Sequence, residues 1–502
     1  MVTRTSGLTS TFKGREQELA VLDRLWAQES ATLFVLYGRR RVGKTRLLTH
    51  WRKHHSENAL YWVAEPGAPA DQLKSFSRAL FRFENPGSSV PAGITYSDWE
   101  TAFWHVGRIA SRQQFALFID EFTYLLDADS TIVGTLQKAW DQELKETNLM
   151  MGLSGSHMGM MEKQVLSYQA PLYGRATELV SLPPLPFGVT KEFFPNYTAE
   201  ERVAIYSIFG GIPAYWERFS PSAPLDENIL YQLLSNNYLL DEPLILLLDH
   251  IDNPAYYVAI LQAISGGNRT NITIQRQTGL AKGHVSRYLS LLRDTGFVDR
   301  QTPVTEPESS RKSRYFVNDP FLRFYYWYLS ANRTQLAIGG QDQALEEILE
   351  ALPKFIEENT WPELCRDWLQ RVAIHDELPT KIRFEEIGSA WTGYQDIPVV
   401  AINHRTKELV LGMALWNDSP AGLVDLQGIT NKTSAIIPKD TSEWRVYFTC
   451  FSKSGWDDES LTFIDRVDEG KVGTKHWQAQ WCRLISLDDV DADLTRLSKV
   501  VR

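Results

Sequence analysis

Apolar runs of strand length alternate with helix-like segments over the first third of the chain. The runs Leu33–Tyr37, Phe115–Ile119 and residues 148–153 are almost continuously apolar. Such runs predict strands buried on both faces, as in a parallel sheet covered by helices. The segment TRLLTHW, which follows the first run, has apolar positions at helical spacing. The first third of the chain is therefore predicted to be an α/β domain with a parallel sheet.

Helical spacing continues through the middle of the chain. Residues 191–250 are helix-like and rich in aromatic side chains, which predicts a helical lid. Three more helices and a β-wing are then predicted, at residues 254–265, 272–279, 282–294 and 297–317. This order, with Gly279 at the turn between the second and third of these helices, predicts a winged helix-turn-helix.

The pattern changes again after residue 355. A helix over residues 355–373 is followed by the strand-like segments FEEIGSAW, DIPVVAIN, ELVLGMALWN and EWRVYFTCFSKSGW. A helix, a hairpin-like strand pair, a further strand and a helix form the core order of restriction-endonuclease-like folds. The C-terminal region is therefore predicted to be a second α/β domain, of that class.

Composition fits a multidomain globular protein. At 502 residues the chain is too long for one hydrophobic core, and 43% hydrophobic residues exclude an extended disordered chain. The predicted parts are the first α/β domain, a helical lid, a winged helix-turn-helix, a linker and the second α/β domain, at residues 1–190, 191–250, 251–335, 336–354 and 355–490.

Charge and cysteine content narrow the functional class. The net charge of -10 argues against a protein that coats nucleic acid over its whole surface, although a local basic patch is compatible with it. Cys365, Cys450 and Cys482 are scattered without CxxC spacing, which favours a reducing compartment over a disulfide framework or a zinc site. No segment has the apolar length of a signal peptide or a membrane span, so we expect a cytoplasmic protein without a membrane partner.

The strongest chemical motif follows the first apolar run. Residues 38–45, GRRRVGKT, fit the spacing G-x-x-x-x-G-K-[ST] between a strand and a helix. Backbone N–H groups of such a loop and the positive end of the following helix cradle a polyphosphate. Lys44 is expected to reach the outer phosphates and Thr45 to ligate Mg²⁺. The predicted cofactors are ATP and Mg²⁺, and the predicted nucleotide contacts here are Gly38, Arg39, Arg40, Arg41, Val42, Gly43, Lys44, Thr45 and Arg46.

A second strand end completes the predicted catalytic site. The second apolar run ends in Asp120 and Glu121, at the edge where an α/β sheet places its ligands. Asp120 is predicted to hold Mg²⁺, and Glu121 to orient and deprotonate the attacking water. Together with Lys44, these two carboxylates are the predicted catalytic residues.

Six ordered motifs resemble the archaeal-type ATPase domain of the AAA+/STAND class. They are FKGREQELAVL, the phosphate-binding loop, LFIDEF, GLSGSHMGMM, PLYGRATELVSLPPL and FGGIPAYWERF, and the resemblance extends to residue 335. It implies that Phe12, Gly14 and Arg15 of the first motif lie near the nucleotide. It also implies that Gly211 and Pro213 form the G-x-P signature that STAND proteins carry in the lid region.

The same resemblance suggests two further contacts to the nucleotide. In this class the strand beside the phosphate-binding loop ends in a polar residue that senses the γ-phosphate, which points to Ser154, with Ser156 close behind. A serine turn that caps the next helix is the alternative. Arg175 stands where the family keeps an arginine; it either senses phosphate, in its own or a neighbour's site, or forms a structural salt bridge.

Basic residues accumulate in the predicted winged helix-turn-helix. Residues 268–317 carry nine Lys and Arg against four Asp and Glu. In a DNA-binding version the third helix enters the major groove while the wing touches the backbone. The predicted DNA contacts are then Lys282, His284, Ser286, Arg287, Arg311 and Lys312. A rigid connector or a protein contact is the alternative.

The C-terminal region resembles a domain of unknown function related to PD-(D/E)xK nucleases. Those nucleases need a helix glutamate, a strand aspartate and an E-x-K, because carboxylates hold the metal and the lysine positions water. Glu363 fits the helix position, but Pro398 stands at the metal aspartate, with Asp396 before it. Met413 and Leu415 replace the acid and the lysine, and neither binds Mg²⁺. We expect the fold without the nuclease reaction.

The leading hypothesis is a STAND-like molecular switch. ATP and Mg²⁺ would close the lid and reposition the winged helix and the inactive C-terminal domain against an unidentified protein partner, and slow hydrolysis would reset it. An alternative is a DNA-binding regulator or defence protein whose DNA affinity depends on ATP. A metal-dependent nuclease is the third hypothesis. Oligomerisation is compatible with all three.

Overall fold

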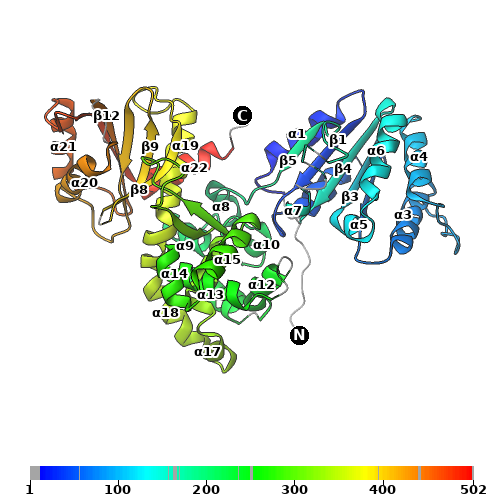
Figure 1. Ribbon diagram of the computed structural model, residues 1–502, viewed down its shortest axis with the longest axis horizontal. Helices are drawn as coiled ribbons and strands as arrows, with labels where there is room; N and C mark the ends of the chain where they lie inside the picture. Colours follow the sequence, from blue (N-terminus) through cyan, green and yellow to red (C-terminus); the bar gives the residue numbers. More distant parts are fainter. Residues whose placement is uncertain are drawn as a thin grey trace. The chain divides into compact units, whose positions relative to one another are not determined.

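The computed structural model divides the chain into two compact units (Figure 1). It describes residues 12–55, 57–156, 158–161, 165, 167–168, 170–235, 237–248, 251, 253–393, 395–438 and 443–499. Within these residues, unit 1 extends to Leu185 and includes Ile212–Ala214, whereas unit 2 contains Pro186–Gly211 and continues from Tyr215. The described residues contain no helix that is long and apolar enough to cross a membrane.

Unit 1 is a parallel β-sheet with helices on both faces (Figure 1). Its strands lie in the order β2-β3-β4-β1-β5, and each neighbouring pair is parallel, as the apolar runs predicted. The strands are β1 (Thr32–Tyr37), β2 (Ala59–Val63), β3 (Phe115–Asp120), β4 (Leu149–Gly155) and β5 (Glu178–Ser181). The helices are α1 (Glu16–Trp26), α2 (Lys44–His54), α3 (Pro69–Glu84), α4 (Trp99–Ala110), α5 (Thr123–Ala128), α6 (Ile132–Gln142) and α7 (Met158–Met161).

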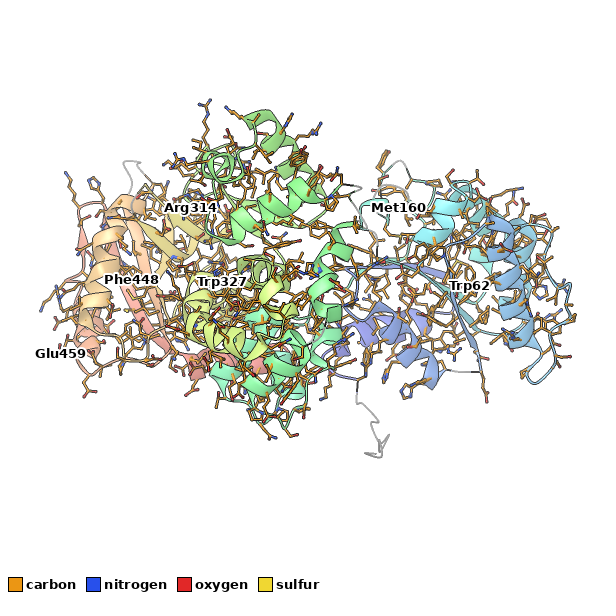
Figure 2. The ribbon with its side chains drawn as sticks, turned by 90° about the horizontal axis from the view of Figure 1, so that it is seen from below. Trp62, Met160, Arg314, Trp327, Phe448 and Glu459 are labelled. Atoms are coloured by element: carbon orange, nitrogen blue, oxygen red, sulfur yellow. The ribbon has the colours of Figure 1, made fainter. Side chains whose placement is uncertain are left out.

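Alternate strand positions of this sheet pack against different helices. One face belongs to the core that α3 to α6 cover, in which Trp62 of β2 is buried (Figure 2). On the other face, Phe34 of β1 contacts Phe118 of β3 at a ring-centroid distance of 5.9 Å. Phe118 in turn contacts Trp51 of α2 at 5.5 Å. Because both faces are covered, the strands need apolar residues at every position.

The strand order brings three strand ends to one edge of the sheet. In the parallel register, Leu36 of β1 pairs with Ser154 of β4, and Ile119 of β3 pairs with Leu153 of β4. The segments that follow these strands therefore begin at the same edge, where α/β sheets place their ligands. The fold thus collects the predicted phosphate-binding loop, the two carboxylates and the serine turn.

Unit 2 begins with a helical region and a winged helix-turn-helix. The helical region contains α8 (Thr190–Phe193), α9 (Ala199–Phe209), α11 (Leu225–Asn228) and α12 (Asn237–Leu248). The short helix α10 (Pro213–Trp216) begins in unit 1 and ends in unit 2. The winged helix comprises α13 (Ala255–Ser265), α14 (Asn271–Thr278), α15 (Lys282–Asp294) and the antiparallel pair β6 (Val298–Gln301) and β7 (Arg314–Val317). Gly279 ends α14 at φ +70°, a left-handed conformation that glycine adopts without strain. The winged-helix prediction is confirmed.

The passage predicted as a linker is mostly helix. After α16 (Pro320–Phe324) and α17 (Arg333–Ala337), residues 341–355 form α18 (Gln341–Phe355). Its buried residues Ala344, Ile348 and Leu352 recur every four positions. The sequence analysis did not predict this helix because the charged residues of QDQALEEILEAL obscured its apolar stripe, which packs inside unit 2. That the passage links two domains stays a prediction.

The C-terminal part of unit 2 is a mixed sheet with helices on it. The sheet order is β13-β14-β12-β10-β9-β8, and β11 pairs with β12. β8 and β10 are antiparallel to β9, whereas β10 and β14 are parallel to β12. The strands are β8 (Glu386–Trp391), β9 (Asp396–Asn403), β10 (Glu408–Gly412), β11 (Ala414–Leu415), β12 (Trp444–Ser452), β13 (Gly473–Thr474) and β14 (Trp477–Ser486). The helices are α19 (Trp361–Ile374), α20 (Leu423–Ile436), α21 (Glu459–Asp468) and α22 (Leu487–Leu497).

Two features of this sheet go beyond the expected pattern. β13 and β14 extend the sheet past the predicted strand order. In β9, both alternating sets of side chains are buried: Ile397, Val399 and Ala401 on one face, and Val400 and Ile402 on the other. The strand is therefore covered on both faces rather than half-buried, which explains why its apolar run is continuous.

Candidate nucleotide site

The predicted phosphate-binding loop joins β1 to α2 in unit 1. A Cβ atom at Gly38 would lie 2.5 Å from the carbonyl oxygen of Leu182, so only glycine fits there. Gly43 has φ +102° immediately before α2, a conformation that glycine adopts without strain. Arg41 also has positive φ, at +69°. A non-glycine residue in this region stores backbone strain, which is common at ligand-binding loops.

Lys44 is buried against the loop. Its side chain is only 5% exposed, and Nζ donates hydrogen bonds to the carbonyl oxygens of Gly38 (2.8 Å) and Arg39 (3.1 Å). Burial lowers the pKa of Lys44 to about 8, against the opposing effect of Glu121 and Asp120. The ammonium group is thus held beside the loop and close to two carboxylates, where a phosphate could replace the carbonyl acceptors.

Asp120 collects three donors at the end of β3. It is 1% exposed, and Oδ2 accepts hydrogen bonds from Thr45 Oγ1 and from the Tyr61 hydroxyl, each at 2.6 Å. Oδ1 accepts from the backbone N–H of Glu121 at 3.0 Å. The predicted pair Thr45 and Asp120 is therefore in direct contact, and its geometry is fixed by a third residue, Tyr61.

Tyr61 is a site residue that the sequence analysis missed. It lies on β2, opposite Phe118 of β3, so its hydroxyl reaches across to the next strand end. Burial raises its pKa, and the nearby Asp120 carboxylate raises it further. The only signal in the sequence is one polar-tipped residue in the strand ALYWV. Without the sheet order, nothing indicated which strand lies beside β3.

Glu121 and the serine turn are also brought together. Glu121 has φ +51°, and Ser156 Oγ donates to its Oε2 at 2.8 Å. Ser154 is fully buried, and in the described residues its Oγ has no hydrogen-bond partner. Ser156 is thus the serine that contacts the predicted base Glu121. Ser154 lies at the end of β4, beside β1, where its hydroxyl could bind a ligand.

These groups fit a nucleotide with a divalent cation. Hard cations such as Mg²⁺ prefer oxygen ligands and usually take one or two from the protein, the others coming from phosphate and water. The Thr45 hydroxyl and the Asp120 carboxylate supply such oxygens beside the buried Lys44. The described residues contain no group of three or more His, Cys, Asp or Glu that could enclose a metal on their own. The donor set therefore suits a phosphate-bound Mg²⁺ rather than an all-protein metal cage.

Arg15 of the first motif holds the loop in place. It is 5% exposed and donates to the carbonyl oxygens of Val42 (3.0 Å) and Pro183 (2.7 Å). Phe12 stacks on His50 of α2 at a ring-centroid distance of 4.4 Å, and Gly14 has φ +67°. The structure thus places these three predicted residues near the loop and α2, and the two hydrogen bonds of Arg15 connect the loop to Pro183.

The two residues of the G-x-P signature fall in different units. Pro213 belongs to unit 1, and its Cγ lies 3.8 Å from the position of a Cβ on Gly43. Gly211 belongs to unit 2. Within unit 1, Pro213 thus lies beside the phosphate-binding loop.

Arg175 is engaged in a structural salt bridge. Its Nε and Nη2 donate to the two carboxylate oxygens of Asp141 in α6, at 2.8 and 2.6 Å, and Nη1 donates to the Pro171 carbonyl. This bidentate pair lowers the pKa of Asp141. The phosphate-sensing role is not supported by this geometry, because all three donor groups of the guanidinium already have acceptors.

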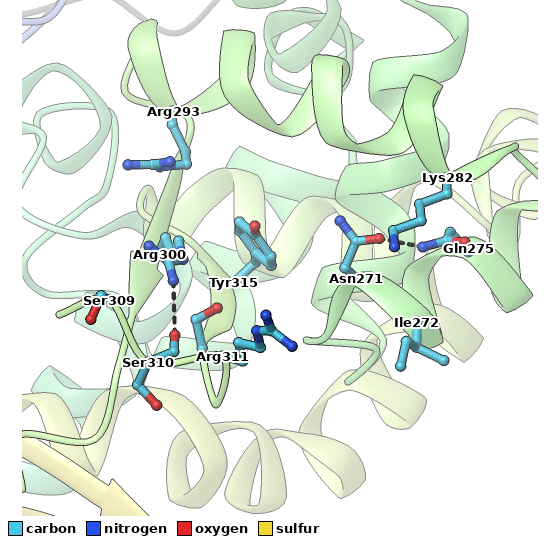
Figure 3. Close-up of a pocket in the computed structure, with 11 residues that line it drawn as sticks. Asn271, Ile272, Gln275, Lys282, Arg293, Arg300, Ser309, Ser310, Arg311 and Tyr315 are labelled. Carbon is cyan, nitrogen blue, oxygen red and sulfur yellow. Dashed lines mark hydrogen bonds between the residues drawn. The ribbon is translucent and has the colours of Figure 1, made fainter. Parts of the chain in front are cut away.

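A basic cleft lies in the winged helix of unit 2 (Figure 3). It has a volume of about 590 Å³ and is formed by α14, α15 and the wing. Its cations are Lys282, Arg293, Arg300 and Arg311, and no acidic residue is among its lining residues. Polar side chains such as Asn271 complete the lining. Four of the nine Lys and Arg residues of the segment 268–317 thus line one cleft.

The predicted DNA contacts are only partly in this cleft. Lys282 and Arg311 line it, whereas His284, Ser286, Arg287 and Lys312 do not. Ser286 accepts a hydrogen bond from Asn271 Nδ2 (3.2 Å), the Arg287 guanidinium lies 5.1 Å from the centre of the Tyr288 ring, and Lys312 pairs with Glu306.

Arg293 and Arg300 are cleft residues that the sequence analysis missed. Arg293 follows Lys282 by eleven residues on α15, which is close to three helical turns and places both on one face. That spacing was a usable signal. Arg300 reaches the cleft only because β6 and β7 fold back beside the helix.

Three positions that the sequence analysis compared with nuclease ligands contact arginine side chains, two of them through ion pairs. Asp396 accepts two hydrogen bonds from Arg314 of β7, at 2.9 and 3.1 Å. Glu363 pairs with Arg323 at 2.8 Å. The carbonyl oxygen of Pro398 accepts from Arg366 at 2.7 Å.

Comparison with known proteins gives three matches along the chain. Residues 12–219 match an ATPase domain found predominantly in Archaea, residues 258–302 an IclR helix-turn-helix domain, and residues 325–426 a domain of archaeal and bacterial proteins of unknown function. The uncharacterized protein MJECL04 of Methanocaldococcus jannaschii is 31% identical over 410 residues, which are 81% of this chain and 88% of that protein.

Two archaeal proteins of solved structure align with part of this chain. The Walker-type ATPase PABY2304 of Pyrococcus abyssi aligns with a TM-score of 0.48 and 20% identity, over 62% of this chain and 95% of its own. The ORC2 protein of Aeropyrum pernix aligns with a TM-score of 0.45 and 12% identity, over 69% and 97%. With the relative from Methanocaldococcus jannaschii and the three domain matches, this chain belongs to the archaeal ATPase family, with a helix-turn-helix domain and a domain of unknown function after the ATPase domain.

Proposed function

We propose that this protein is a Mg²⁺-dependent, ATP-binding molecular switch that hydrolyses ATP slowly. The observation that carries the proposal is the contact between the Thr45 hydroxyl and the Asp120 carboxylate at 2.6 Å, beside the buried Lys44. The match of residues 12–219 to an ATPase domain supports it. The STAND assignment rests on the G-x-P segment, of which Pro213 lies next to Gly43.

Each group at the site has a distinct task in this proposal. Lys44 binds the outer phosphates, while Thr45 and Asp120 hold Mg²⁺. Bound Mg²⁺ neutralises charge on the phosphates. Glu121 accepts the proton of the attacking water, and Ser156 orients the Glu121 carboxylate through the 2.8 Å hydrogen bond. A base held at φ +51° keeps its direction only while the surrounding contacts hold it there.

The course of the chain suggests how a bound nucleotide in unit 1 could affect unit 2. Ile212–Ala214 is a short piece of unit 1 between two stretches of unit 2. Within unit 2, Arg202 of α9 forms a buried ion pair with Asp491 of α22, so the lid helix is tied to the C-terminal helix. A shift of Pro213 would therefore act on a single body that includes the lid, the winged helix and the C-terminal domain. In this proposal the ATPase domain, lid, winged helix, connector and C-terminal domain comprise residues 1–190, 191–250, 251–335, 336–354 and 355–490. The helix α18 forms most of the connector.

Hydrogen exchange tests this switch directly. In the full chain, amides of residues 209–217 are expected to exchange more slowly with Mg²⁺ and a non-hydrolysable ATP analogue than with Mg²⁺ and ADP, because a γ-phosphate at the loop would order Pro213. Residues 444–452, which form the buried strand β12, serve as the internal control and should not respond. Equal exchange in the two nucleotide states, or no Mg²⁺-dependent ATP binding, would overturn the switch.

A second function, binding of nucleic acid, is favoured by the basic cleft. Four cations without a lining carboxylate suit a phosphate backbone, whose neutralisation releases counterions. We propose that the cleft follows the backbone of duplex DNA, with Arg293 and Arg300 added to the predicted contacts Lys282 and Arg311.

Charge reversal in the cleft provides the test. The double variant Lys282→Glu, Arg293→Glu is expected to weaken binding of a labelled duplex by about tenfold or more, and to flatten the dependence of affinity on salt. The control, Lys354→Glu with Lys381→Glu, reverses two exposed lysines that do not line the cleft. Fluorescence anisotropy over a salt series measures both. Equal losses in the two double variants would show that the cleft has no special role.

We further propose a restriction-endonuclease-like C-terminal domain without nuclease activity. The topology supports the fold, since β8, β9 and β10 are antiparallel neighbours and β12 joins β10 in parallel after α20. The ion pairs of Asp396 and Glu363 with arginines support the lost activity. Met413, partly buried against the core, offers no ligand. Incubation of DNA with Mg²⁺ or Mn²⁺ and the protein should leave it intact.

A further inference from the structure

The wing of the winged helix is attached to the C-terminal domain within unit 2. Val304, in the loop after β6, is 3% exposed and belongs to the hydrophobic core of the C-terminal sheet. Its backbone N–H donates to the carbonyl oxygen of Ser389 in β8 at 3.0 Å. A Cβ on Gly388 would lie 2.7 Å from Val304 Cγ1, so β8 has no side chain at the point of closest approach. Val304 therefore anchors the wing loop in the hydrophobic core of this domain.

Two residues of the C-terminal domain, Asp396 and Trp391, hold the other side of the wing. Arg314 of β7 forms two hydrogen bonds with Asp396, and its guanidinium lies 4.6 Å from the centre of the Trp391 ring. The Trp391 indole N–H donates to the carbonyl oxygen of Lys312 at 2.8 Å. Stacking and bidentate pairing together fix both the position and the plane of the guanidinium.

The same strand forms a wall of the basic cleft. Successive side chains of a β-strand point to opposite faces. Arg314 faces Asp396, whereas its neighbours Ser313 and Tyr315 line the cleft. Arg300, paired with Tyr315 across the hairpin, also lines the cleft and donates to the carbonyl oxygen of Ser310 at the wing tip. The contacts of Arg314 with Asp396 and Trp391 therefore also fix the position of Ser313 and Tyr315 in the cleft.

We propose that the C-terminal domain is a clamp for the wing. Asp396 and Trp391 fix the position of the wing, and the wing in turn sets the shape of the basic cleft. In the sequence analysis, Asp396 stood just before the position of the nuclease metal aspartate. This inference deepens the proposed nucleic-acid function and rests on it for the occupant of the cleft, duplex DNA. The contact between wing and domain can be tested without DNA.

The experiment loosens the clamp without touching the cleft. In the full chain, Asp396→Asn removes the charge of a 60% exposed side chain, and Trp391→Phe removes the indole donor while keeping a ring. The matched control is Asp376→Asn, which breaks the pair of a 59% exposed aspartate with Lys381 in the same domain. Hydrogen exchange of residues 302–316 reports on the wing, and anisotropy of a labelled duplex reports on the cleft.

The expected result is faster exchange of the wing. The double variant should exchange residues 302–316 about threefold to tenfold faster than wild type, and bind duplex about threefold or more weakly, whereas Asp376→Asn changes neither. The exposed substitution Asp396→Asn alone should show a smaller effect in the same direction, which guards against misfolding of the double variant.

Other outcomes separate the two proposals. Unchanged wing exchange in the double variant overturns the clamp. A looser wing with unchanged duplex affinity overturns its influence on the cleft. If the wing loosens while even the wild-type chain binds no duplex, the clamp stands and the proposed nucleic-acid function fails.

Discussion

The variant Lys44→Ala is expected to lower the affinity for Mg²⁺-ATP by about 10- to 100-fold and to abolish detectable hydrolysis. Charge-assisted hydrogen bonds each contribute about 1.5–3 kcal/mol, and alanine removes the buried ammonium group that would donate them to the phosphates. Its present acceptors, the carbonyl oxygens of Gly38 and Arg39, show that the group reaches the loop. Titration with a fluorescent ATP analogue measures the affinity.

Lys53→Ala provides the matched control for this prediction. Lys53 lies in the last turn of the same helix α2 and is exposed, so its loss should change neither binding nor hydrolysis. Because burial lowers the pKa of Lys44 to about 8, the wild-type affinity should also fall as the pH rises through 8, where the ammonium loses its proton. Lys44→Ala should lack that dependence. If wild type and Lys44→Ala bound Mg²⁺-ATP equally well, the proposal that this loop binds the phosphates would be wrong.

The variant Glu121→Gln is expected to keep ATP binding and to lose hydrolysis by about 10²- to 10⁴-fold, the usual contribution of a general base. Glutamine has the same size, and its amide oxygen still accepts the hydrogen bond from Ser156, so the local geometry at φ +51° is retained. What it cannot do is accept the proton of the attacking water. Single-turnover phosphate release, compared with analogue binding, separates the two effects.

The control for this variant is Glu146→Gln. Glu146 is exposed and ends the short 3-10 helix Leu144–Glu146, which follows α6 in unit 1. The control variant should hydrolyse ATP as wild type does. If Glu121→Gln were to hydrolyse ATP at the wild-type rate, the base would have to be another group, and the Ser156 contact would be structural only.

The local elements were largely predictable because each carries its own periodicity. The three helices of the winged helix-turn-helix start and end within one residue of their predicted bounds, and β9 covers the predicted residues 396–403. In both regions strong signals coincide: the apolar spacing, Gly279 at a left-handed position and a continuous apolar strand. The helix α18 was missed because its apolar stripe is narrow and lies among charged residues.

The candidate site was only half predictable, since pairing between distant segments leaves little local trace. Lys44, Thr45 and Asp120 stand in motifs with fixed spacing, and the structure brings them together. Tyr61 belongs to the candidate nucleotide site, and Arg300 to the basic cleft, only through the neighbouring strand. Arg175 and Asp141 are 34 residues apart, and their salt bridge depends on the packing of α6.

The sequence by itself determined the motifs, the order of the helices and strands, and the absence of acid and lysine at Met413 and Leu415, because these depend on residue identity and short-range spacing. Only the tertiary structure decided the partners of the charged groups. It joined Tyr61 to Asp120 and Arg314 to Asp396. Charges and hydroxyl groups find their partners across strands and domains, at distances along the chain that no local pattern encodes.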